Sequence, residues 1–135
     1  EGETPSDRLR EAAEDAGAVV YGADVDLPGL LRNADLVVTE PAGGSIREAM
    51  AAGVPMIILD TDGIGATDTA YVVGAGIGVL AKQPDQVAAI VQEWLRPGNP
   101  TLAEMTQRTQ ELAQPHGAQK IARIVLERLS SRPPE

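Results

Sequence analysis

The sequence has no cysteine and very few aromatic residues. Its 135 residues include no Cys, no Phe, one Trp, two Tyr and one His. Without cysteine the chain can form neither a disulfide nor a Cys-ligated metal site, and a single histidine cannot supply a His cluster for zinc. The shortage of aromatic side chains also argues against a single-strand nucleic-acid module, because such modules stack bases on aromatic rings.

Basic residues are also scarce, which argues against a nucleic-acid partner. The chain has 11 Lys and Arg against 20 Asp and Glu, so its formal net charge is −9. A protein that binds nucleic-acid phosphates needs the opposite sign, and we therefore expect no nucleic-acid partner. No apolar run in the sequence approaches the ~20 residues that a membrane-spanning helix requires.

Segments typical of helices and strands alternate along the chain. Strands are expected at residues 18–21, 36–39, 56–59 and 76–80. Helices are expected at residues 4–16, 27–33, 45–52, 67–74, 84–95, 101–113 and 118–129. The strands are short and largely apolar, as in a parallel sheet that helices cover on both faces. The sequence therefore predicts one α/β domain, a Rossmann-like parallel sheet over residues 1–135 with C-terminal helices from about residue 84.

Ligands of such sheets bind beyond the carboxyl ends of the strands. In this chain those ends are expected to lead into three loops, at residues 22–26, 40–45 and 60–66. The search for functional residues therefore concentrates on these loops.

The loop at residues 41–45 joins a strand to a helix and contains adjacent glycines. Gly43 and Gly44 let a ligand approach the backbone closely, and N–H groups at a helix start favour an anion. One turn further on, the Glu48 carboxylate can accept the two hydroxyl donors of a diol. The spacing Ser45–Glu48 is also that of a capping box, which needs no ligand. On local pattern alone both interpretations stay open.

The stretch around this loop resembles the donor-binding half of GT-B glycosyltransferases. Residues 34–60 read ADLVVTEPAGGSIREAMAAGVPMIILD, and this is the specific part of the resemblance. The similarity continues through residues 71–79 into the C-terminal helices, and reaches back to residues 21–22 and 27–31. The closest branch includes monogalactosyldiacylglycerol synthases and the lipid-II-forming N-acetylglucosaminyltransferase.

The resemblance implies a UDP-sugar as donor substrate, no cofactor and no metal. The pyrophosphate would lie against the backbone N–H groups of residues 43–45 and the Ser45 hydroxyl, and Glu48 would accept both ribose hydroxyls. The loop at Ala23 and Asp24 would contact uracil through backbone groups. The implied substrate-binding residues are Gly43, Gly44, Ser45, Glu48, Ala23, Asp24 and Asp62. No residue of the chain is assigned a catalytic role.

One residue and one loop depart from the family pattern. Glu40 stands where galactolipid-synthase relatives carry a lysine, and an acid beside a pyrophosphate is unfavourable unless it points away. After the third strand those relatives have a Pro-Gly-Gln-Glu loop, whereas Ile64 and Gly65 stand here and cannot replace an amide and a carboxylate. We therefore expect weak discrimination among UDP-sugars. Three nearby acids are either compensating sugar contacts or ordinary turn and cap acids: Asp60, Asp62 and Asp68.

The resemblance also implies that the first two strands of the family's donor domain are missing from this chain. The acceptor-binding domain, which supplies the family's catalytic base, would be missing as well. Strand edges at residues 18–21 and 36–39 would then be unpaired, which favours homo-oligomers or pairing with another chain.

The favoured function is the UDP-sugar-binding part of a glycosyltransferase that moves a hexosyl group to a lipid or small-molecule hydroxyl. On its own the chain is expected to transfer no sugar. One alternative is a noncatalytic donor-binding partner of a split glycosyltransferase, and another is a degenerate structural domain. The expected location is the cytoplasm, with attachment to the membrane surface through an acceptor-binding domain or partner chain.

Overall fold

The computed structural model describes residues 5–113 and 116–131. Along the chain the elements follow in the order α1 (Pro5–Asp15), α2 (Leu27–Arg32), β1 (Val37–Thr39), α3 (Gly43–Ala52), β2 (Met56–Leu59), α4 (Ala66–Gly74), β3 (Gly78–Ala81), α5 (Pro84–Trp94), α6 (Thr101–Leu112) and α7 (Gly117–Ser130). From β1 to α5, strands and helices alternate as the sequence predicts.

The three strands form one parallel sheet in the order β1-β2-β3. Val38 of β1 pairs with Ile57 of β2, and Ile57 pairs in turn with Val79 of β3. Because all three strands run the same way, their carboxyl ends meet at one edge of the sheet. This confirms the predicted α/β class with a Rossmann-like parallel sheet, and it brings the loops after β1 and β2 together.

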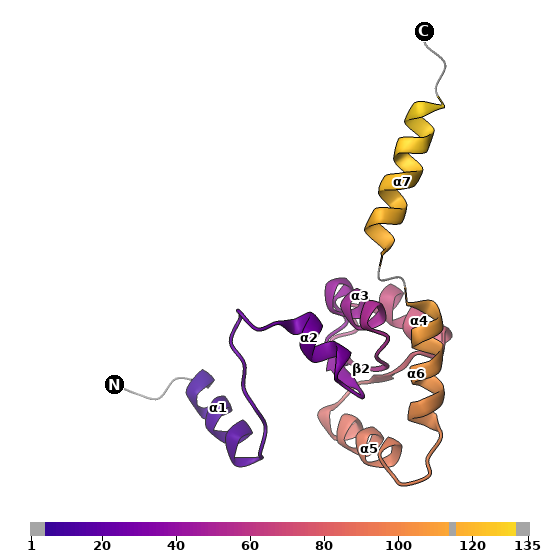
Figure 1. Ribbon diagram of the computed structural model, residues 1–135. Helices are drawn as coiled ribbons and strands as arrows, with labels where there is room; N and C mark the ends of the chain where they lie inside the picture. Colours follow the sequence, from indigo (N-terminus) through magenta and orange to yellow (C-terminus); the bar gives the residue numbers. More distant parts are fainter. Residues whose placement is uncertain (1–4, 114–115, 132–135) are drawn as a thin grey trace.

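Helices cover both faces of the sheet (Figure 1), and each face has its own apolar core. Alternate residues of β2 point to opposite faces, as the pleat of a strand requires. Ile46 of α3 and Val72 of α4 pack with Met56 and Ile58 on one face. Ile57 packs on the other face with Trp94 of α5. The burial of Met56, Ile57 and Ile58, with Leu59 partly buried, explains the wholly apolar sequence of β2.

The predicted strand at residues 18–21 is wrong, because the structure shows irregular backbone there. Val19 and Tyr21 are 73% and 54% exposed, so this apolar segment packs on no core. A strand needs a neighbour to pair its backbone groups, and within the described residues β1 pairs with β2 alone. With no second strand beside it, the segment has nothing to complete a ladder.

Two helices differ from the rest in their burial. The predicted helix over residues 118–129 is confirmed as α7, yet none of its residues is buried. The described residues of α1 are likewise almost all exposed, and Figure 1 shows both helices outside the layered body. Within residues 5–113 and 116–131, no helix combines the length and the apolar character that a membrane crossing requires.

Candidate functional site

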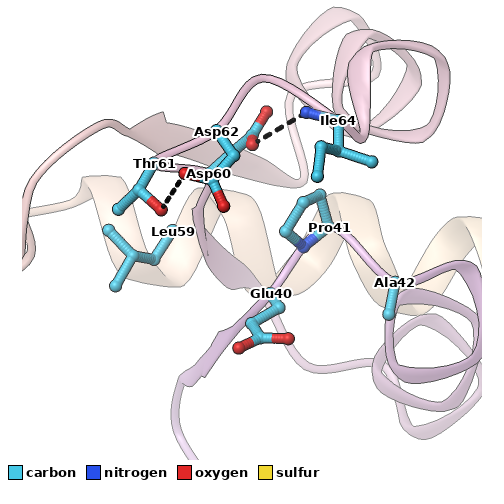
Figure 2. Close-up of a pocket in the computed structure, with 8 residues that line it drawn as sticks. All are labelled: Glu40, Pro41, Ala42, Leu59, Asp60, Thr61, Asp62 and Ile64. Atoms are coloured by element: carbon cyan, nitrogen blue, oxygen red, sulfur yellow. Dashed lines mark hydrogen bonds between the residues drawn. The ribbon is translucent and has the colours of Figure 1, made fainter.

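A hollow of about 390 Å³ lies where β1 and β2 end. It is formed by the turn after β1 and the loop after β2, which face each other across it (Figure 2). Its lining residues are Glu40, Pro41, Ala42, Leu59, Asp60, Thr61, Asp62 and Ile64. The hollow therefore joins two of the three loops that the sequence singles out.

The two walls of the hollow approach closely at Gly65 and Pro41. A Cβ atom added to Gly65 would meet the Pro41 ring and would lie 2.8 Å from the Pro41 carbonyl oxygen. The backbone at Gly65 has φ −95°, so the requirement for glycine is one of space rather than of conformation. Gly65 thus sets the separation of the two loops.

The amino end of α3 borders the hollow and presents unpaired backbone donors. The helix begins at Gly43 with Ala42 as its N-cap, and its first internal bond runs from the Ile46 N–H to the Ala42 carbonyl at 3.1 Å. The N–H groups of residues 43–45 consequently have no acceptor within the helix. A Cβ atom at Gly44 would meet nothing within 4 Å, so space for a ligand is open beside these donors.

The capping-box interpretation of Ser45 and Glu48 is wrong. Ala42 is the N-cap of α3 and makes no side-chain cap bond, so Ser45 lies one turn too far along to cap. Both side chains are exposed, and neither makes a hydrogen bond or ion pair with any described residue. Their polar groups are accordingly available to a ligand at the end of the helix.

A cation that the sequence pattern did not indicate, Arg47, lies beside the same loop. The Arg47 guanidinium and the Asp68 carboxylate each lie 2.9 Å from the place where a Cβ of Gly43 would stand. Arg47 follows Gly43 by four residues on α3, a spacing that puts two residues on one helix face, so the helical pattern could have identified it. Asp68 belongs to the first turn of α4, which brings this acid to the amino end of α3.

Three further acids lie at the hollow, in different settings. The Glu40 carboxylate points away from the loop after β2 (Figure 2). The Asp62 carboxylate is exposed and accepts a bond from the Thr61 hydroxyl at 3.2 Å. Asp60 is buried, with only 3% of its surface exposed. Glu40 and Asp62 can therefore meet a ligand, whereas Asp60 faces inward.

Asp60 is the most heavily engaged polar side chain of the site. Its Oδ1 accepts the N–H groups of Gly63 at 2.7 Å and of Ile64 at 3.2 Å, and its Oδ2 lies 3.5 Å from the Lys82 Nζ. Burial raises the pKa of Asp60, but the Gly63 N–H, the Lys82 charge and the Ile64 N–H together bring the pKa below its ordinary value. Asp60 is therefore ionised at neutral pH.

The residues implied for uracil lie elsewhere. Ala23 and Asp24 are exposed in the turn before α2, and neither lines the hollow. The neighbouring Asp26 instead caps α2 by accepting the Gly29 N–H at 3.1 Å. A uracil contact at residues 23 and 24 stays a prediction. Among the residues that the structure describes, no group of three or more His, Cys, Asp or Glu is placed to hold a metal ion.

Most of the chain matches a family model. The matching family is described as glycosyl transferases group 1, and the match extends over residues 3–114. It includes the sheet, the hollow and the amino end of α3.

Individual relatives match over shorter shares of their own length. The chain is 30% identical to a probable monogalactosyldiacylglycerol synthase 3 of Oryza sativa subsp. japonica, over 80% of this chain and 22% of that protein. It is 35% identical to monogalactosyldiacylglycerol synthase 1 of Arabidopsis thaliana, over 64% of this chain and 16% of that protein. It is also 30% identical to a UDP-N-acetylglucosamine--N-acetylmuramyl-(pentapeptide) pyrophosphoryl-undecaprenol N-acetylglucosamine transferase of Burkholderia mallei, over 87% of this chain and 35% of that protein. The chain thus spans about a third or less of each of these relatives.

A solved structure shows a partial likeness. It is the glycotransferase of kitacinnamycin, with 26% sequence identity and a TM-score of 0.48, over 73% of this chain and 28% of that one.

Proposed function

Because the chain belongs to the glycosyl transferases group 1 family, we propose that it is the part of a GT-B glycosyltransferase that binds a UDP-sugar donor. The observation that carries this proposal is the amino end of α3. Three N–H groups unpaired within the helix, an open approach at Gly44 and two side chains without a partner among the described residues, Ser45 and Glu48, lie within its first two turns.

The charges of this site suit a nucleoside diphosphate. Backbone N–H groups and the positive end of the helix dipole favour a pyrophosphate. The Arg47 guanidinium beside Gly43 adds a positive charge, which the Asp68 carboxylate at the same distance from Gly43 offsets in part. The Glu48 carboxylate can accept both hydroxyls of a ribose ring, because a carboxylate offers two acceptor oxygens.

The hollow between the two loops is the proposed place for the sugar. Thr61 and Asp62 offer polar groups there, whereas Ile64 offers none and is 83% exposed. With few polar contacts of fixed geometry, the hollow is expected to discriminate only weakly among hexoses.

The proposed reaction is hexosyl transfer from UDP-sugar to a hydroxyl. The bond between the anomeric carbon and the diphosphate oxygen breaks, a new bond to the acceptor oxygen forms, and the hydroxyl proton passes to a base in another domain. The amino end of α3 would stabilise the charge that develops on the departing UDP. Two relatives are named for lipids, diacylglycerol and undecaprenol, which supports a lipid acceptor and work at a membrane surface.

Calorimetric titration with UDP tests the proposal. A charge-assisted hydrogen bond contributes about 1.5–3 kcal/mol, so Glu48→Ala should weaken UDP binding roughly 10- to 150-fold. Glu127→Ala is the matched control, since Glu127 is an exposed helical glutamate on α7. Equal UDP affinities for Glu48→Ala and the wild-type chain would remove Glu48 from the site, and an absence of UDP binding would refute the proposal itself.

A further inference from the structure

The loop after β2 depends on one buried carboxylate for its shape. Residues 61–64 are all exposed, and within the loop the only side-chain bond joins Thr61 to its neighbour Asp62. Two backbone N–H groups of this loop, those of Gly63 and Ile64, are taken by Asp60 Oδ1. Figure 2 shows the bond to Ile64 closing the loop back onto the end of β2.

The same carboxylate ties the loop to the rest of the sheet. Asp60 Oδ2 lies 3.5 Å from the Nζ of Lys82, which directly follows β3. The Asp60 N–H also donates to the Ala81 carbonyl at 3.0 Å, so main chain and side chain both fix the residue against β3. Asp60 is therefore held on one side and holds the loop on the other.

Burial makes a direct contact between Asp60 and a ligand unfavourable. Its side chain is 4% exposed, and both of its oxygens already have partners within the protein. The exposed side of the hollow is instead formed by the residues that Asp60 keeps in place, among them Asp62 and Ile64. An acid at this position thus acts through the loop and not on the substrate.

We propose that Asp60 is a positioning residue, which uses the Gly63 and Ile64 N–H groups and Lys82 to hold residues 61–65 as the sugar-facing wall of the donor site. The inference rests on the proposed function for the identity of the ligand. It adds that sugar binding and nucleotide binding depend on different parts of the site. The diphosphate is held by α3, and the sugar is held by a loop whose order comes from Asp60.

Three variants separate the contacts. Asp60→Ala removes every side-chain contact of the residue and keeps the main-chain bond to Ala81. Asp60→Asn keeps an acceptor for the two N–H groups and loses the charge that attracts Lys82. Lys82→Gln removes the same attraction from a half-exposed position, so it leaves the buried core untouched. Asp35→Asn is the control for charge, because Asp35 is an exposed acid just before β1, at the opposite end of the sheet.

The first measurement is the backbone order parameter of residues 61–65 by NMR relaxation, without ligand. In the wild-type chain we expect values close to the rigid range of about 0.85, and in Asp60→Ala values below about 0.6. Asp60→Asn and Lys82→Gln should fall between the two, and Asp35→Asn should match the wild-type chain. Unchanged order parameters in Asp60→Ala would overturn the proposal, and if that variant does not fold, unchanged values in both Asp60→Asn and Lys82→Gln would do so.

The second measurement is the affinity of the same variants for UDP and UDP-glucose by calorimetry. Asp60→Ala should weaken UDP-glucose binding about three- to tenfold and change UDP binding less than twofold. Equal losses for the two ligands would mark a merely structural role and would also overturn the proposal. If the wild-type chain binds no UDP, it is the proposed function that fails, and the order parameters still decide whether Asp60 holds the loop.

Discussion

A single glycine, Gly65, determines how closely the two loops of the hollow approach each other. Gly65 lets the two loops touch, and replacing it by alanine would press a methyl group into Pro41. We expect Gly65→Ala to lower the free energy of unfolding by roughly 1–3 kcal/mol, as overpacking generally does. Urea denaturation measures this, and Gly44→Ala is the matched control.

At Gly44 the added methyl group meets nothing within 4 Å and lies on a helix. Alanine there should therefore leave the stability unchanged or raise it by up to about 1 kcal/mol. Equal effects of the two substitutions would show that Gly65 and Pro41 are not in close contact in solution.

Asp60 makes the stability of the fold depend on pH. Its pKa in the folded chain lies below the ordinary value of 3.8, so the ionised form stabilises the fold at pH values above about 4. This stabilisation is lost as the pH falls from 3.8 through the lower pKa of the folded chain. Urea denaturation of the wild-type chain and Asp60→Asn between pH 2.5 and roughly 6 should give a stability difference that shrinks below about pH 4. A difference that stays constant over this range would contradict the assigned contacts.

Among single residues, the sequence indicated the position of the loop between β1 and α3 better than the contacts around it. The succession of a strand, a glycine pair and a helix predicts the glycines and Glu48 as site residues, and their part in binding stays a prediction. Arg47 and the link between Asp60 and Lys82 were not found as parts of the site. The Lys82 contact joins residues from neighbouring strand ends, and only the strand order brings these together.

Among the elements, β2 contributes buried residues to both apolar cores, whereas no residue of α7 is buried. Ile57 of β2 is fully buried, so Ile57→Ala should cost about 2–5 kcal/mol of stability. Leu129 of α7 is 59% exposed, so Leu129→Ala should change the stability by less than about 0.5 kcal/mol. Thermal unfolding of the two variants makes the comparison. A loss at Leu129 as large as that at Ile57 would mean that α7 packs on a surface of this chain in solution.

Residues 18–21 show why an apolar pattern alone is insufficient to predict a strand. An apolar run predicts a strand, but a strand forms only where a neighbour satisfies its backbone. The runs at β1, β2 and β3 have such neighbours within the chain, and the run at 18–21 has none among the described residues. Val38 on the open edge of β1 is 47% exposed, and self-association through this edge stays a prediction.

For the molecule as a whole, we expect that this 135-residue chain alone transfers no sugar. It spans about a third or less of relatives named as transferases or synthases, and its single histidine, His116, precedes α7 and does not line the hollow. Without a bound acceptor and a base, the gain from orienting two reactants, which reaches about 7–11 kcal/mol, is lost. Incubation with labelled UDP-glucose and UDP-galactose, with and without diacylglycerol, checks this. Product above the no-protein control would show that the chain carries its own acceptor site and base.

We propose above all that the amino end of α3 holds the diphosphate of a nucleotide. An NMR titration of the ¹⁵N-labelled chain with UDP tests it most directly, since each backbone N–H reports on its own surroundings. We expect saturable shifts that are largest at Gly43, Gly44 and Ser45 and that extend to Glu48. The absence of shifts at millimolar UDP, or shifts concentrated away from the ends of β1 and β2, would contradict it.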